Sequence, residues 1–415
     1  MVALVNGVTT LQRLIAAIAV FATLSLAACG GGSGGSGTDN DGSNVPEEPE
    51  DLIPEPVVSA EALAIDQTDA AGITELLGYR MPAVSGGVTI ANAVVLIPQG
   101  EVPQGGFPVV GWGHRASGVS DFCAPSVSDD LRGTAAYLNQ LVANGYAVVA
   151  ADFEGLGTED AHPYLHLGSG GRSLLYAVYA AVSEYESLSN RYAVLGHSQG
   201  GHAALGAGEL AGELQDIELT GVAAIAPPSQ LVDQSLTLNA IISDTSRSLA
   251  DRAQAAGVVL INSALLAKGV EAVNPNFVID SVFGNNGSNL LNSLELECIS
   301  ELISTLVAPV TGALFISGNV DSIISDTIIE VPVVRQYLND LEPGRMAISV
   351  PVQLMQGLLD ETVLPQSTVL LSNFIASVNT LPPTIIEYPS ADHTTVLDQS
   401  FDDVLAFLAA VFAAE

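Results

Sequence analysis

The sequence predicts an α/β domain in which a mostly parallel sheet is covered by helices on both faces and carries a mainly helical cap insertion. From about residue 88, short apolar runs typical of strands alternate with segments of helical length. Such alternation indicates a parallel sheet whose two faces are both buried. The predicted strands are 93–97, 107–112, 146–151, 192–195, 221–226, 349–355 and 384–388, and the predicted helices include 129–143, 171–187, 199–211 and 397–413.

The alternation stops between about residues 229 and 345, where helical patterns and polar turns occur without a series of parallel strands. A compact domain rarely holds a structureless connection of this length, so the segment is predicted to be folded. We therefore assign residues 229–345 to the cap, and residues 57–228 together with 346–415 to the α/β core.

The first 28 residues have the pattern of an export signal. Arg13 precedes an apolar run over 14–28, which is short for a membrane span and typical of a secretory signal peptide. The run ends in Ala27-Ala28-Cys29-Gly30, which resembles the bacterial lipoprotein signal, where the cysteine is lipidated. We expect an exported bacterial lipoprotein anchored to a membrane through Cys29, with an ordinary signal peptide as the alternative.

Residues 29–56 are predicted to be a disordered tether behind that anchor. Residues 30–37 are only Gly and Ser, and residues 38–56 add seven acidic side chains, four prolines and no basic side chain. The whole chain has 46 acidic and 11 basic residues and a formal charge of −35. Because this charge repels phosphate backbones, nucleic-acid binding is excluded as a function.

Two cysteines remain when Cys29 is assigned to the lipid. Exported proteins meet an oxidising compartment, so Cys123 and Cys298 are predicted to form a disulfide. Two unpaired buried thiols are the alternative. Neither cysteine has neighbouring Cys or His at zinc-site spacing, and no metal is expected.

The catalytic signal is the segment Gly196-His197-Ser198-Gln199-Gly200, which follows a predicted strand and precedes a predicted helix. A sharp turn from strand to helix strains the serine and places it at a helix N-terminus, where free backbone N–H groups can stabilise an oxyanion. The pattern Gly-x-Ser-x-Gly also occurs around Ser33, but that segment lies in the tether. We therefore predict Ser198 as the nucleophile.

Serine needs a base and an orienting acid, which follow it along the chain in this architecture. Five of the six histidines, His202 included, come before or within the segment 192–203 that contains the serine. Only His393 lies beyond that segment, and it precedes the last predicted helix. Asp360 follows the strand 349–355 and is the predicted acid, with Glu361 as its near rival and Asp321 as a distant one. Asp392 is adjacent to the histidine, and neighbouring residues on a loop rarely let such a carboxylate reach Nδ1.

The predicted oxyanion donors are the backbone N–H of Gln199 and one from the loop after strand 107–112. In that loop, Arg115 and Ala116 both remain candidates, and His114 is interpreted as a hydrogen-bonding organiser of the loop. The segment 152–158, at the end of another strand, is predicted to shape the pocket.

These residues resemble a known family. Trp112-Gly113-His114 with Gly118, Cys123-Ala124-Pro125-Ser126, and the serine motif with Asp360 and His393 are similar to the secretory lipase family of the α/β-hydrolases, over about residues 75 to 415. The resemblance implies a Ser-Asp-His triad, a cap inserted before the acid, and hydrolysis of acylglycerols or simpler carboxylic esters without a metal or other cofactor. Arg115 stands where relatives often carry Gly.

The expected function is therefore ester hydrolysis through an acyl-enzyme intermediate, with an ester or lipid as the substrate. Two alternatives stay open, namely a serine hydrolase that acts on a peptide or polyester bond and a catalytically silent surface-binding lipoprotein.

Overall fold

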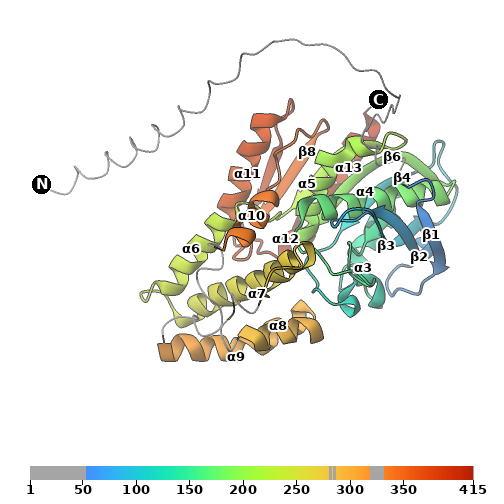
Figure 1. Ribbon diagram of the computed structural model, residues 1–415. Helices are drawn as coiled ribbons and strands as arrows, with labels where there is room; N and C mark the ends of the chain where they lie inside the picture. Colours follow the sequence, from blue (N-terminus) through green and yellow to red (C-terminus); the bar gives the residue numbers. More distant parts are fainter. Residues whose placement is uncertain (1–52, 280–282, 284–286, 318–330, 415) are drawn as a thin grey trace, which may run out of the picture. The chain divides into compact units, whose positions relative to one another are not determined.

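The central element is a nine-stranded sheet with the strand order β1-β2-β3-β5-β4-β6-β7-β8-β9 (Figure 1). The computed structural model describes residues 53–279, 283, 287–317 and 331–414. The six strands in the order β5-β4-β6-β7-β8-β9 are parallel to one another, whereas the pairs β1–β2, β2–β3 and β3–β5 are antiparallel. The strands are β1 Val57–Ala62, β2 Ala71–Pro82, β3 Val88–Pro98, β4 Phe107–Gly113, β5 Ala147–Ala151, β6 Leu188–His197, β7 Glu218–Ile225, β8 Val352–Gly357 and β9 Thr384–Tyr388.

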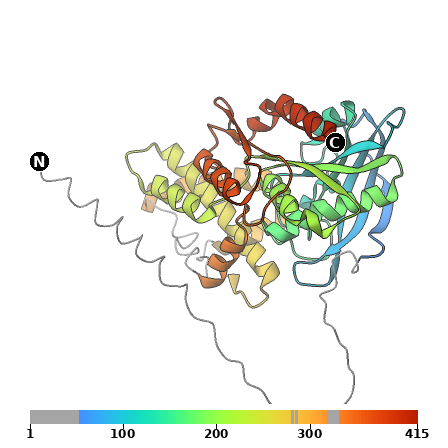
Figure 2. The ribbon, with the colours of Figure 1, turned by 90° about the horizontal axis from the view of Figure 1, so that it is seen from above.

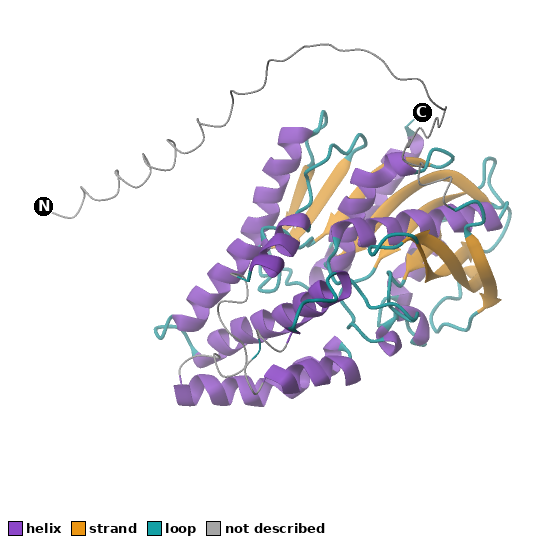
Figure 3. Cartoon of the chain, in the orientation of Figure 1, coloured by secondary structure: helices purple, strands orange, loops and turns teal. Residues whose placement is uncertain are grey.

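Helices cover both faces of this sheet, as the sequence predicts (Figures 2 and 3). In β4, Val109 packs toward one apolar core and Val110 toward the other, because successive side chains of a strand point to opposite faces. The first core includes residues of α4 Leu167–Glu184, α5 Gln199–Leu210 and α11 Pro365–Val378. The second includes residues of α3 Ala135–Ala143, α12 Thr395–Gln399 and α13 Phe401–Ala413.

In the described part of the chain between β7 and β8, five helices share a third apolar core. They are α6 Leu231–Ser243, α7 Leu249–Val273, α8 Gly287–Leu296, α9 Ile299–Ser317 and α10 Pro332–Asp340, drawn in yellow and orange in Figure 1. We call this group the cap helices. Among the described residues, only α7 is long and apolar enough to cross a membrane, but 56% of its apolar stretch is buried. Leu260 and Leu265 of α7 are fully buried in the cap, as in the core helix of a soluble protein.

Some elements differ from the sequence prediction. The sequence does not predict β1 and β2, because at this edge of the sheet β1 has no buried residue and β2 is buried only in its second half. Helix α3 begins at Ala135 instead of 129, since three successive residues, 131–133, have positive φ and cannot continue a helix. The predicted helix 397–413 is divided into α12 and α13 at Ser400.

The described chain starts inside the segment predicted to be a tether. Ile53 is 1% exposed and packs in the same core as α4 and α5, so the packed part of the chain includes residues before Val57. The predicted signal peptide, Cys29 and most of the tether lie outside the described residues.

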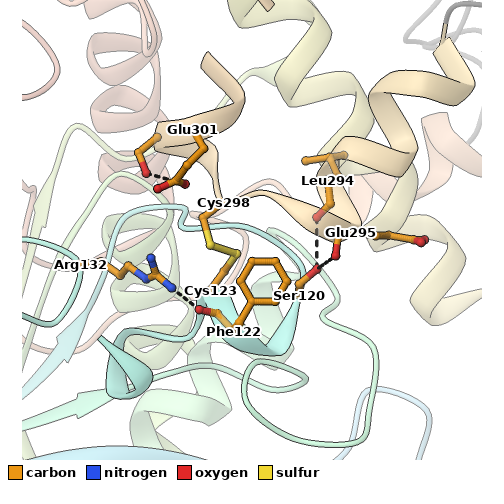
Figure 4. Close-up of a disulfide and its surroundings, with 9 residues drawn as sticks. Ser120, Phe122, Cys123, Arg132, Leu294, Glu295, Cys298 and Glu301 are labelled. Carbon is orange, nitrogen blue, oxygen red and sulfur yellow. Dashed lines mark hydrogen bonds between the residues drawn. A yellow bond between two sulfur atoms is a disulfide. The ribbon is translucent and has the colours of Figure 1, made fainter. Parts of the chain in front are cut away.

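A disulfide joins the core to the cap helices. Cys123 lies in a short 3-10 turn after β4, and Cys298 lies just before α9, with the two Cα atoms 5.5 Å apart (Figure 4). Around it, the Ser120 hydroxyl donates to the carbonyls of Leu294 and Glu295. A Cβ atom on Gly118 would lie 2.6 Å from Sγ of Cys123, so the bond needs a glycine beside it. The disulfide predicted from the cysteine count is present.

Candidate active site

A sharp turn between β6 and α5 carries Ser198. The residue has φ 55° and ψ −120°, a conformation that residues with a side chain rarely adopt. Glycines let the neighbouring backbones approach closely. A Cβ atom on Gly200 would lie 1.8 Å from the carbonyl oxygen of Gly113, and one on Gly196 would lie 2.1 Å from that of Gly200. The spacing of these glycines therefore permits the strained turn that presents Ser198 at the N-terminus of α5.

The loop between β9 and α12 brings His393 to this serine. Its Nε2 lies 3.0 Å from Oγ of Ser198, and its Nδ1 lies 2.7 Å from Oδ2 of Asp360. The three predicted side chains, separated by up to 195 positions in the sequence, thus form one hydrogen-bonded chain. With Nδ1–H donating to the carboxylate, Nε2 is left as an acceptor for the serine hydroxyl.

Asp360 lies just beyond the end of β8, and its side chain is fully buried. Its Oδ1 accepts the backbone N–H groups of Thr362 and Val363, each at 2.8 Å. Its Oδ2, which faces His393, also accepts the amide of Gln356 at 3.2 Å. These donors compensate the burial of a carboxylate and fix which oxygen meets the imidazole.

The rival carboxylates are placed differently. Glu361 is exposed to solvent. Asp392 accepts N–H and O–H groups of Thr394 and Thr395 and closes the turn before α12, and these hydrogen bonds lower its pKa. Asp321 lies outside the described residues.

The predicted oxyanion donors lie on either side of the turn. Gln199 is the first residue of α5, and Arg115 and Ala116 follow β4, the strand next to β6. None of these three backbone N–H groups donates to another described residue, which leaves them available for a ligand oxygen. Both Arg115 and Ala116 remain candidates for the second donor.

Two buried histidines connect these donors to the segment after β5. His114 places Nδ1 2.6 Å from the carbonyl oxygen of Arg115 and Nε2 3.2 Å from that of Asp152, in agreement with its interpretation as an organiser of the loop. His162 was not identified from the sequence. Its Nδ1 donates to the carbonyl of Glu154 at 2.7 Å, and its Nε2 accepts the side-chain amide of Gln199 at 2.9 Å. These contacts join residues up to 38 positions apart, and no local pattern predicts them.

Burial keeps both of these rings neutral near neutral pH. Desolvation lowers the pKa of His114 and that of His162 to about 4 in each case, and it outweighs the opposite effect of their carbonyl partners. A neutral His162 is required for the geometry, because only a ring without a proton on Nε2 can accept from Gln199.

A cavity of about 60 Å³ opens beside Ser198 under the cap helices. Its walls combine apolar side chains of α6, α7 and α10 with a few polar ones and with the loop after Asp360. Lining residues include Leu231, Leu238, Asn262, Leu266, Val334 and Val363. Among the described residues, no three His, Cys, Asp or Glu side chains gather as a metal site.

A family model decides the identity of the chain. The model described as "Secretory lipase" matches residues 133–414, a range that includes Ser198, Asp360 and His393. The chain belongs to the secretory lipase family. It is therefore a carboxylic ester hydrolase with the α/β-hydrolase fold, in agreement with the sequence prediction. No curated protein sequence matches this secretory lipase.

Solved structures support the fold of this secretory lipase. The "rice cell wall degrading esterase LipA" from Xanthomonas oryzae is 20% identical with a TM-score of 0.67, and the match covers 86% of this chain and 96% of LipA. Candida antarctica lipase A in its closed state is 18% identical with a TM-score of 0.67, covering 88% and 84%. A putative hydrolase from Legionella pneumophila is 17% identical with a TM-score of 0.66, covering 87% and 99%.

Proposed function

We propose that this secretory lipase cleaves short-chain carboxylic esters, acylglycerols among them, by acyl transfer through Ser198, His393 and Asp360. The observation that carries the proposal is the chain of contacts from Ser198 Oγ to His393 Nε2, and from His393 Nδ1 to Asp360 Oδ2, at 3.0 and 2.7 Å. This order of groups is what general-base activation of a serine requires.

In the first step, His393 takes the proton of Ser198 as Oγ forms a bond to the ester carbonyl carbon. The negative charge that develops on the carbonyl oxygen is stabilised by the backbone N–H of Gln199 and by that of Arg115 or Ala116. Asp360 stabilises the imidazolium and keeps its ring oriented. The tetrahedral intermediate then collapses, and the leaving alcohol departs with the proton from His393, which leaves an acyl-enzyme.

In the second step, water replaces the alcohol. His393 removes a proton from the water, and the resulting attack on the acyl carbonyl forms a second tetrahedral intermediate. Its collapse breaks the bond to Ser198, which recovers its proton from His393, and the carboxylic acid is released. The same N–H groups serve both intermediates, so the site needs no rearrangement between the two steps.

The size of the cavity supports a preference for short acyl chains. Its volume of about 60 Å³ is small, and such a space accommodates a short acyl chain more readily than a long one. We expect hydrolysis rates of aryl esters to be highest for short chains such as butyryl and to decrease toward palmitoyl. Leu238→Ala, which enlarges the cavity, should move the optimum toward longer chains.

Rates measured across an acetyl-to-palmitoyl series test this expectation. The matched control is Leu260→Ala, since Leu260 is buried in the cap core and does not line the cavity, so it should reduce stability without moving the optimum. An optimum at palmitoyl in the unaltered protein would refute the short-chain preference. A folded protein that hydrolyses none of these esters would refute the function itself.

We further propose export and membrane anchoring through a lipid on Cys29. The support is the apolar run that ends at Cys29 and the uncharged Gly/Ser segment after it. When the full chain is produced in a bacterium fed labelled palmitate, the label is expected in the protein and absent from a Cys29→Ala variant. Equal labelling of the two proteins would contradict the proposal.

A further inference from the structure

We propose that His197 is a positioning residue that holds the loop carrying His393, an inference that rests on the proposed function. His197 is the last residue of β6, directly before the nucleophile, and it is 2% exposed. Its Nε2 lies 2.8 Å from the carbonyl oxygen of His393. Since a carbonyl can only accept, Nε2 carries the proton and donates. One rigid strand thus positions Ser198 directly and its base through a neighbouring side chain.

The loop that carries His393 needs such a support. Its residues 389, 390, 392 and 394 are exposed, and its buried anchor is Ala391. On one side the carbonyl of Ala391 accepts the N–H of Leu359, and on the other Asp392 closes the turn before α12. The hydrogen bond from His197 holds the peptide group of His393 itself, between the hydrogen bond at Ala391 and the turn that Asp392 closes before α12. It therefore restricts the backbone from which the imidazole projects.

The electrostatics agree with this role. Burial lowers the pKa of His197 well below its ordinary value. The charge that His393 carries when protonated and the charge of Arg115 act in the same direction, and they and the burial outweigh the hydrogen bond to the His393 carbonyl. The centroids of the His197 and His393 rings are 5.0 Å apart. A neutral ring at this distance leaves the imidazolium that forms during catalysis without a like charge beside it, whereas a protonated His197 would oppose it. His197 therefore positions His393 without raising the free energy that is needed to protonate its imidazole.

The test compares kcat and KM for a short-chain aryl ester in substituted full-length proteins. His197→Leu removes the donor and keeps an apolar side chain, and we expect kcat to fall between about tenfold and 100-fold with KM changed by less than about twofold. His197→Gln keeps an amide N–H near the position of Nε2 and should restore most of kcat. In His197→Asn the side chain is too short to reach the carbonyl, so its kcat should be as low as that of His197→Leu. This variant replaces His197→Leu in the test if the leucine variant does not fold.

His202→Leu is the matched control. His202 is also buried, and its Nε2 donates to a backbone carbonyl, that of Leu341 at 2.7 Å, which is remote in sequence from His393. Its loss should lower the melting temperature about as much as His197→Leu does, while kcat changes by less than about threefold.

Three results would overturn the inference while Ser198→Ala is inactive. The first is an unchanged kcat in His197→Leu. The second is a kcat in His197→Gln that is as low as in His197→Leu. The third is an equal loss of kcat in His202→Leu, because that would indicate a general effect of lowered stability. If Ser198→Ala itself retains activity, the proposed function fails, and this outcome is distinct from the other three.

Discussion

Ser198→Ala is expected to reduce kcat for a short-chain ester by about 10⁴-fold or more, because no other described group takes the place of the nucleophile beside His393. The fold should persist, since the serine hydroxyl makes no hydrogen bond to a described residue other than His393. Labelling with a fluorophosphonate should be lost together with activity. Steady-state kinetics and mass mapping of the labelled peptide measure both effects.

The chain supplies its own control for this experiment. Ser33 has the same Gly-x-Ser-x-Gly pattern, and Ser33→Ala should leave kcat and labelling unchanged. Ser198→Gly should be inactive but more stable than Ser198→Ala by about 1–3 kcal/mol, because glycine adopts φ 55° without strain. Activity that survives in Ser198→Ala would show that the nucleophile lies elsewhere.

Loss of the disulfide is expected to have the largest effect on stability. Cys123 and Cys298 are 175 positions apart, and closing a loop of this length in the unfolded chain corresponds to a stabilisation of about 5 kcal/mol in the chain-entropy model. Cys298→Ser should therefore shift the urea midpoint strongly downward. The hydrogen bonds from Ser120 to the end of α8 would remain, but they are few and partly exposed.

Urea unfolding followed by circular dichroism measures this change. Cys123→Ser should give the same urea midpoint as Cys298→Ser, and the double variant should show no further decrease in the midpoint. The reason is that all three variants lack the same disulfide. Cys29→Ala is the matched control, since Cys29 takes no part in the disulfide, and its midpoint should equal that of the unaltered chain. A midpoint unchanged in Cys298→Ser would contradict the prediction.

The parts of the fold predicted from the sequence share a physical cause. Strands β4 to β7 lie in the parallel part of the sheet and are buried on both faces, so they appear as continuous apolar runs. Strand β2 lies near the edge and includes Thr74, Glu75 and Arg80, so no run marks it. The sequence predicts the start of α3 too early, because the conformation of residues 131–133 depends on how the preceding turn packs. The amino-acid composition of the segment does not indicate that packing.

The identities of the candidate nucleophile and base follow from the sequence alone, because a strand, a glycine-flanked serine and a helix must form a tight turn, and His393 is the only histidine beyond the helix that this turn begins. The sequence also predicts Asp360 as the acid but leaves its neighbour Glu361 as a rival. The tertiary structure separates the two, because it buries Asp360 and gives it two backbone N–H groups that orient one oxygen. It alone also reveals the contact of His197 with His393, 196 positions away. Local patterns specify strands, turns and helices, whereas the hydrogen-bond partner of a buried side chain depends on which distant segment folds against it.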